Sequence, residues 1–127
     1  MRRLIPAFLS AIATAAQGAC ELPGGQAQKI QSAHYLVLYR TLPAPLKVGQ
    51  HFSVEFAVCP TPESVRIDAG MPEHKHGMNY RPTVTATGEG RYRADGLMLH
   101  MAGKWELVFE VRAKDSVERV AQVIQLE

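Results

Sequence analysis

The feature that most constrains the fold is an alternation of two sets of side chains along the chain with a period of two. It is clearest in residues 33–40, where Tyr35, Val37 and Tyr39 occupy one side of an extended chain, and in residues 51–56. Similar runs cover residues 64–68, 83–87, 91–95, 105–112 and 117–126. Clusters of Gly, Pro and Asp separate the runs, and no segment has a convincing helical period. The pattern predicts an all-β, antiparallel sandwich of about seven or eight strands.

The chain is long enough for one domain, and its first residues have the organisation of a secretory leader. Two arginines, Arg2 and Arg3, precede an apolar run at 4–16 and small residues at 18–19. The run is too short to span a bilayer, although a buried N-terminal helix is an alternative interpretation. We therefore expect a signal peptide at 1–19, a flexible lead-in at 20–28 and the β-domain at 29–127. The location would be the periplasm or cell envelope, and the mature protein would not be an integral membrane protein.

The charge of the mature chain gives no sign of a nucleic-acid partner. Removal of Arg2 and Arg3 with the leader leaves 12 basic residues against 12 acidic ones. No basic stripe interleaved with aromatic residues is present. We expect no nucleic acid among the partners.

Cys20 and Cys59 are the only cysteines, and an even number in an exported chain favours a disulfide between them. Two alternatives remain at this point. Cys20 stands where a lipoprotein carries its lipid anchor, although Gln17 replaces the aliphatic residue usual three places upstream. The two thiols could also ligate copper, although they lack a C-x-x-C spacing.

Residues 71–78, MPEHKHGM, lie in a stretch without strand pattern, 69–82, which is expected to form a loop. His74 and His76 are one residue apart, so in extended backbone both imidazoles face the same side and can converge on one ion. Gly77 permits a bend that could bring Met78 toward the same point, and Met71 stands at the other end.

A second group, Met98-Leu99-His100-Met101, repeats this chemistry at the end of a strand. Imidazole suits copper, zinc and nickel, whereas thioether is soft, so the mixture favours copper, above all Cu(I), with Cu(II) held by the histidines. The candidate metal ligands are therefore His74, His76, Met78, Met71, His100 and Met101. Methionine is also a common core residue, and the histidines could be structural. Leu97 and Leu99 are expected in the core, with Met98, His100 or both facing away from it.

Signs of catalysis are lacking in the sequence. There is no G-x-S-x-G elbow and no carboxylate pair marked out for acid and base roles. A zinc hydrolase using three of the histidines, with Glu73 as base, would leave the methionines unexplained. The sequence predicts that the protein is not an enzyme.

Residues 68–107 resemble the YtkA-like domain family, small exported bacterial domains related to FixH-like proteins. The resemblance rests on the M-P-x-H-x-H-G run, the following Arg81-Pro82, the G-x-Y segment at 90–92 and the M-x-G-x-W-x-L pattern at 101–107. It implies an immunoglobulin-like β-sandwich in the cell envelope. Through the family's link to copper handling, it also implies a site at His74, His76 and Met78, with Met71, His100 and Met101 as partners.

These observations together predict a periplasmic copper-binding protein that acts as a carrier, or as an accessory to copper handling or cuproenzyme assembly. Its partner would be a cuproenzyme or a membrane copper protein. A rival hypothesis is a metal-free envelope interaction module whose MPEHKHGM loop docks on another protein. Zinc binding by the histidines alone is the third.

Overall fold

The computed structural model describes residues 20–127, so the leader expected at 1–19 lies outside the described residues. These residues form nine strands and no helix. The strands are β1 (Gln28–Gln31), β2 (Leu36–Leu42), β3 (Phe52–Cys59), β4 (Ser64–Met71), β5 (His76–Gly77), β6 (Thr83–Gly88), β7 (Arg91–Leu97), β8 (Gly103–Ala113) and β9 (Ser116–Leu126). Since there is no helix in 20–127, none is available that could cross a membrane.

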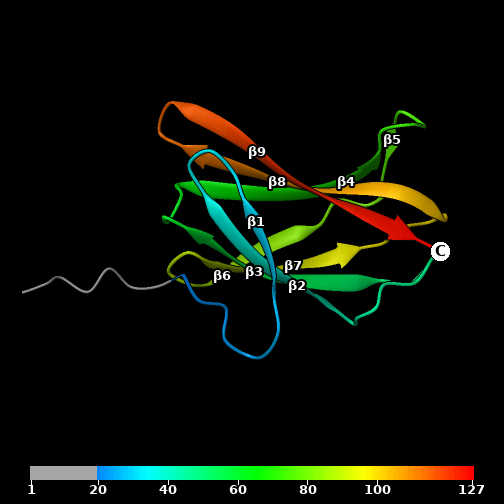
Figure 1. Ribbon diagram of the computed structural model, residues 1–127, viewed down its shortest axis with the longest axis horizontal. Helices are drawn as coiled ribbons and strands as arrows, with labels where there is room; N and C mark the ends of the chain where they lie inside the picture. Colours follow the sequence, from blue (N-terminus) through cyan, green and yellow to red (C-terminus); the bar gives the residue numbers. More distant parts are fainter. Residues whose placement is uncertain (1–19) are drawn as a thin grey trace, which may run out of the picture.

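The strands form two antiparallel sheets that pack face to face as a sandwich (Figure 1). The first sheet has the order β1-β2-β3-β7-β6 and the second the order β5-β4-β8-β9. If β2, β3, β4, β6, β7, β8 and β9 are lettered A to G, the sheets read A-B-E-D and C-F-G, which is the strand order of an immunoglobulin-like sandwich. The predicted fold class is thus confirmed, and β1 and β5 are short additions at the sheet edges.

The core lies between the sheets and is built from the period-two pattern. On β8, Trp105, Leu107, Phe109 and Val111 are fully buried and face the other sheet, while the residues between them are more exposed. Phe56 of β3 meets Phe109 edge-on, with ring centroids 5.0 Å apart. Within 20–127, no polar or charged residue counts as buried, so apolar contacts hold the sheets together.

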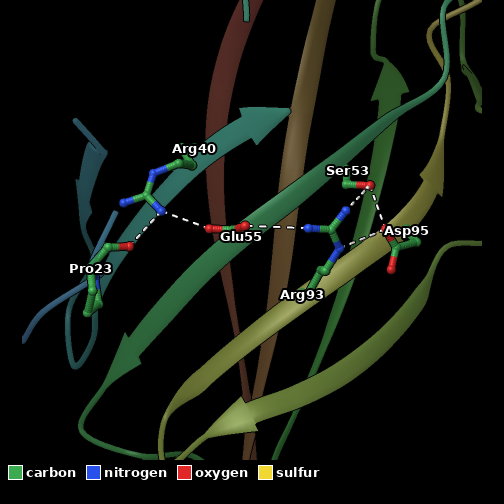
Figure 2. A network of polar contacts seen from close by, with 6 residues as sticks. All are labelled: Pro23, Arg40, Ser53, Glu55, Arg93 and Asp95. Carbon is green, nitrogen blue, oxygen red and sulfur yellow. Dashed lines mark hydrogen bonds and ion pairs between the residues drawn. The ribbon is translucent and has the colours of Figure 1, made fainter. Parts of the chain in front are cut away.

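The segment before β1 is attached to the first sheet through Arg40 of β2. The Arg40 guanidinium donates hydrogen bonds to the carbonyl oxygens of Leu22 at 2.7 Å and Pro23 at 2.8 Å. It also pairs with Glu55 at 2.8 Å, and Glu55 lies 3.4 Å from Arg93. Figure 2 shows Glu55 between the two guanidinium groups, with Arg93 continuing the network to Asp95 and Ser53.

A disulfide joins Cys20 to Cys59 at the end of β3, with the two Cα atoms 5.8 Å apart. The predicted pairing is confirmed. Because both sulfur atoms are engaged, neither a thioether-linked lipid on Cys20 nor a copper-ligating thiol pair is compatible with this structure.

Candidate metal centre

The MPEHKHGM segment forms a β-hairpin rather than the expected loop. β4 continues to Met71 and β5 returns beside it, with Met71 opposite His76 and Gly70 opposite Gly77. The connecting residues 72–75 turn the chain, and Lys75 adopts a left-handed backbone with φ of 54°. The His74 amide donates to the Met71 carbonyl at 3.1 Å, which closes the turn and places His74 beside the paired strands.

The pairing fixes the side of the sheet on which His76 lies. Directly opposed residues of antiparallel strands project to the same face, so His76 shares the face of Met71, which is buried in the core. Along its other edge, β4 pairs with β8, and Gly70 is opposite Glu106. The next residues along the two strands are Met71 and Trp105, so Trp105 lies next to Met71 on this same inner face. His76 is therefore at the open rim of the core, at one end of the sandwich.

Three imidazoles from two separate segments meet at this rim. The ring centroids of His74 and His76 are 5.7 Å apart, and those of His76 and His100 are 5.3 Å apart. Trp105 meets His100 edge-on at 5.4 Å and His76 at 6.1 Å. The structure thus brings together the three histidines that the sequence singled out, against a buried indole.

The segment that carries His100 is anchored on both sides. Leu97 and Leu99 are buried, as expected, so that Met98 and His100 lie on the other side of the chain and are half-buried. The Trp105 indole Nε1 donates to the Met101 carbonyl at 2.9 Å, and the Gly49 amide donates to the Leu99 carbonyl at 2.9 Å. These two hydrogen bonds fix the position of His100 relative to the hairpin.

The ring nitrogens of His76 and His100 differ in their surroundings. His76 Nδ1 lies 3.3 Å from the Gly77 carbonyl oxygen, which can only accept, so in the neutral imidazole this contact favours the tautomer with the proton on Nδ1 and the lone pair on Nε2. His100 Nδ1 is shielded from solvent and has no hydrogen-bond partner within the described residues. A buried polar atom without a protein partner is uncommon, and an ordered water, an ion or a functional role accounts for such an atom.

The three candidate methionines differ in how deeply their side chains are buried. Met71 is 1% exposed, and a Cβ added at Gly103 would come within 2.7 Å of its Cε, so its side chain fills the core beneath Gly103. Met78 is partly buried in a groove beside β4 that Ile67 and Tyr80 also line. Met101 is 37% exposed, while its backbone is held by Trp105.

The remaining polar residues near the cluster and elsewhere have other partners. Glu73 lies 4.0 Å from Lys104 at the surface, an exposed pair. His34 Nδ1 lies 2.6 Å from Glu118, and His51 packs edge-on against Tyr80 at 5.2 Å. In residues 20–127, no three or more His, Cys, Asp or Glu side chains are arranged to hold a metal ion together. The three imidazoles form a row rather than a closed cage.

Trp105 enters the sequence analysis only as part of the M-x-G-x-W-x-L pattern at 101–107, without a role at this site. Its indole is the common neighbour of His76 and His100, and it also fixes the backbone of Met101. The signal that could have revealed this was the spacing, because Trp105 is four residues after Met101, within reach across the turn at Gly103. Comparison with family models, curated proteins and solved structures finds no match to this chain.

Proposed function

We propose that the protein binds a copper ion as cargo between His76 and His100 in the row of imidazoles, and that it acts as a copper carrier in the periplasm or cell envelope. The observation that carries this proposal is the orphaned, solvent-shielded Nδ1 of His100 next to two further imidazoles. A metal ion would supply the partner that this nitrogen lacks.

The donors present fit copper better than a structural zinc ion. Zinc in structural sites takes four ligands in a tetrahedron, whereas this rim offers imidazoles in a row. Cu(I) accepts low coordination numbers, and imidazole and thioether are both suitable ligands for copper. We assign His76 Nε2 and His100 Nδ1 as its donors, with the exposed side chains of His74 and Met101 beside them at the surface.

The position of the row suits delivery rather than permanent storage. His74 and His76 are exposed, on a hairpin whose second strand is only two residues long. An incompletely coordinated ion at such a rim can be taken over by ligands of a partner, such as a cuproenzyme or a membrane copper protein. The disulfide agrees with an oxidising compartment, to which the expected leader would direct the chain.

The test is a Cu(I) titration against a chromophoric competing chelator, with Zn(II) in parallel. The full chain is expressed in bacteria and purified as the cells process it, and its intact mass shows whether residues 1–19 have been removed. We expect one tight Cu(I) equivalent, which is lost in the double variant His74→Ala with His76→Ala. His34→Ala is the matched control, because His34 is exposed but paired with Glu118 away from the cluster.

Two outcomes would contradict the copper proposal. Tight zinc binding without Cu(I) competition would favour the zinc hypothesis. Competition for neither metal would favour the docking module, and the double variant should then lose partner binding instead.

A further inference from the structure

The four sheet edges of the sandwich differ in how well they are protected against pairing with another strand. A free edge exposes unpaired backbone N–H and C=O groups, which proteins usually guard with short strands, charges, prolines or bulges. β1 has four residues including Lys29, and β4 carries Arg66 and Asp68 beside the two-residue β5. β6 follows Pro82 directly and has a register shift between Ala86 and Gly88.

β9 is the exception. It has eleven residues, is hydrogen-bonded on one side only, and pairs with β8 without any register shift. Its second half, residues 120–126, reads VAQVIQL and contains no charge, no proline and no glycine. A groove runs beside this half, and the only charged side chain lining it is Arg40, which is already paired with Glu55.

The sequence of β9 is complementary to itself about Val123. In a symmetric antiparallel pair centred on this residue, Val123 meets the Val123 of a second copy, and Val120 meets Leu126. Arg119 then lies opposite Glu127, so the outermost pairs at both ends have opposite charges. Each pair joins residues on the same face of the sheet, as a continuous sheet requires. Val123 is also 50% exposed, so its side chain is accessible to a second copy.

We propose that β9 is a dimer interface, through which two copies of this chain join their second sheets edge to edge about a two-fold axis at Val123. The occupant is a second copy because the self-pairing matches apolar with apolar positions and Arg119 with Glu127, as an isologous contact demands. The groove lined by residues 26–28, 39–42, 44–46 and 122–126 provides the space beside the strand. This proposal is independent of copper binding.

The first experiment is sedimentation of the full chain, purified as the bacteria process it, over a range of concentrations. We expect an increase toward twice the mass of the single chain. Val123→Lys places two like charges opposite each other on the axis and should weaken dimerisation by at least about tenfold.

Val117→Lys is the matched control, because Val117 is on the same face of β9 and is 49% exposed, but lies outside the paired residues 119–127. It should dimerise like the unmodified protein. A circular dichroism spectrum of each variant shows that the fold is retained.

A second measurement does not depend on a destabilising charge. Because residue 123 lies on the axis, Val123→Cys should form an intermolecular disulfide under mild oxidation, whereas Val117→Cys should not. A protein that is monomeric at every concentration, or cross-linking that is equal at 117 and 123, would overturn the proposal.

Discussion

His100 is half-buried, and its ring nitrogen Nδ1 is shielded from solvent without a hydrogen-bond partner among the described residues. Leaving a buried polar group unsatisfied costs roughly 1–3 kcal/mol of folding free energy. Proteins keep such a destabilising group where it binds a ligand, because residues that improve binding often lower stability.

Replacing His100 by Phe should therefore separate stability from binding. Phe keeps a planar aromatic ring against Trp105, slightly larger than imidazole, and removes the orphaned nitrogen, so the metal-free protein should be unchanged or stabilised by about 1 kcal/mol. Cu(I) affinity should fall in the same variant. Urea unfolding and the competitor titration measure the two effects, and a loss of more than about 1 kcal/mol would show that the imidazole is needed for the fold.

Gly103 is a second residue whose environment restricts which residues can replace it. Its φ of 131° is unfavourable for any residue with a Cβ, and that Cβ would meet the buried Met71 Cε at 2.7 Å. Gly103→Ala should destabilise the protein by about 1–3 kcal/mol, measured by urea unfolding. Combining it with Met71→Ala should recover part of this loss, and full additivity of the two changes would contradict the contact.

Several residues of the candidate site could be identified from the sequence. The spacing of His74 and His76 predicted neighbouring imidazoles, and the apolar Leu97 and Leu99 predicted that His100 lies on the other side of its chain. The sequence does not predict the burial of Met71, because residues 69–82 lack a strand pattern and are expected to form a loop. In the hairpin, Met71 continues the inward positions of Ile67 and Ala69, so its thioether belongs to the core pattern.

At the scale of elements, the β4–β5 hairpin and the lead-in are the parts that sequence reasoning described least well. Long strands with alternating residues were predicted within a few positions, since burial of one face dictates the pattern. Two-residue β5 and four-residue β1 are too short to show a period. They form because neighbouring strands offer free backbone groups, which depends on tertiary structure.

The lead-in depends on Arg40, whose side chain is 11% exposed and donates to carbonyls of Leu22, Pro23, Gly25 and Gln26 as well as to Glu55. Arg40→Gln should lower the free energy of unfolding by about 2 kcal/mol. It should also make residues 21–27 susceptible to proteolysis. Arg93→Gln is the control, since Arg93 contacts Glu55 but no carbonyl of the lead-in. Equal protection of the segment in all three proteins would refute this role.

For the molecule as a whole, the disulfide and the candidate metal centre are at opposite ends. Cys59 is the last residue of β3, and Phe52, its first, pairs with Leu97 beside the His100 segment. Seven residue-to-residue steps of extended chain separate them, which corresponds to roughly 23 Å.

Replacing both cysteines by serine should lower stability by about 4 kcal/mol, because the bond closes a loop with a sequence separation of 39. Cu(I) affinity at low temperature should be unchanged. Thermal unfolding and the competitor titration test the two statements, and a parallel loss of binding would show that the two ends are coupled.

Glu118 of β9 connects the second sheet to the turn between β1 and β2. It accepts hydrogen bonds from the Ser32 hydroxyl and the His34 backbone, and it pairs with the His34 ring. The Ser32 hydrogen bond, followed by the contact with His34, lowers the pKa of Glu118 below its ordinary value of 4.5.

A lowered pKa in the folded state means that the ionised carboxylate stabilises the fold above the ordinary pKa. This contribution is lost as the pH falls through the lower, folded value. The unmodified protein should therefore be more stable than Glu118→Gln near neutral pH, and the difference should shrink as the pH is lowered below 4.5. Urea midpoints across this range measure it; a difference that persists in acid would rule out ionisation as its source.

The position of Trp105 has a practical consequence. It is the only tryptophan of the chain, is fully buried, and lies against His76 and His100 but far from the disulfide. Its intrinsic fluorescence is therefore a built-in optical probe of one end of the sandwich. A copper ion among the imidazoles would quench that emission without any attached label, so that loading and transfer to a partner could be followed in real time.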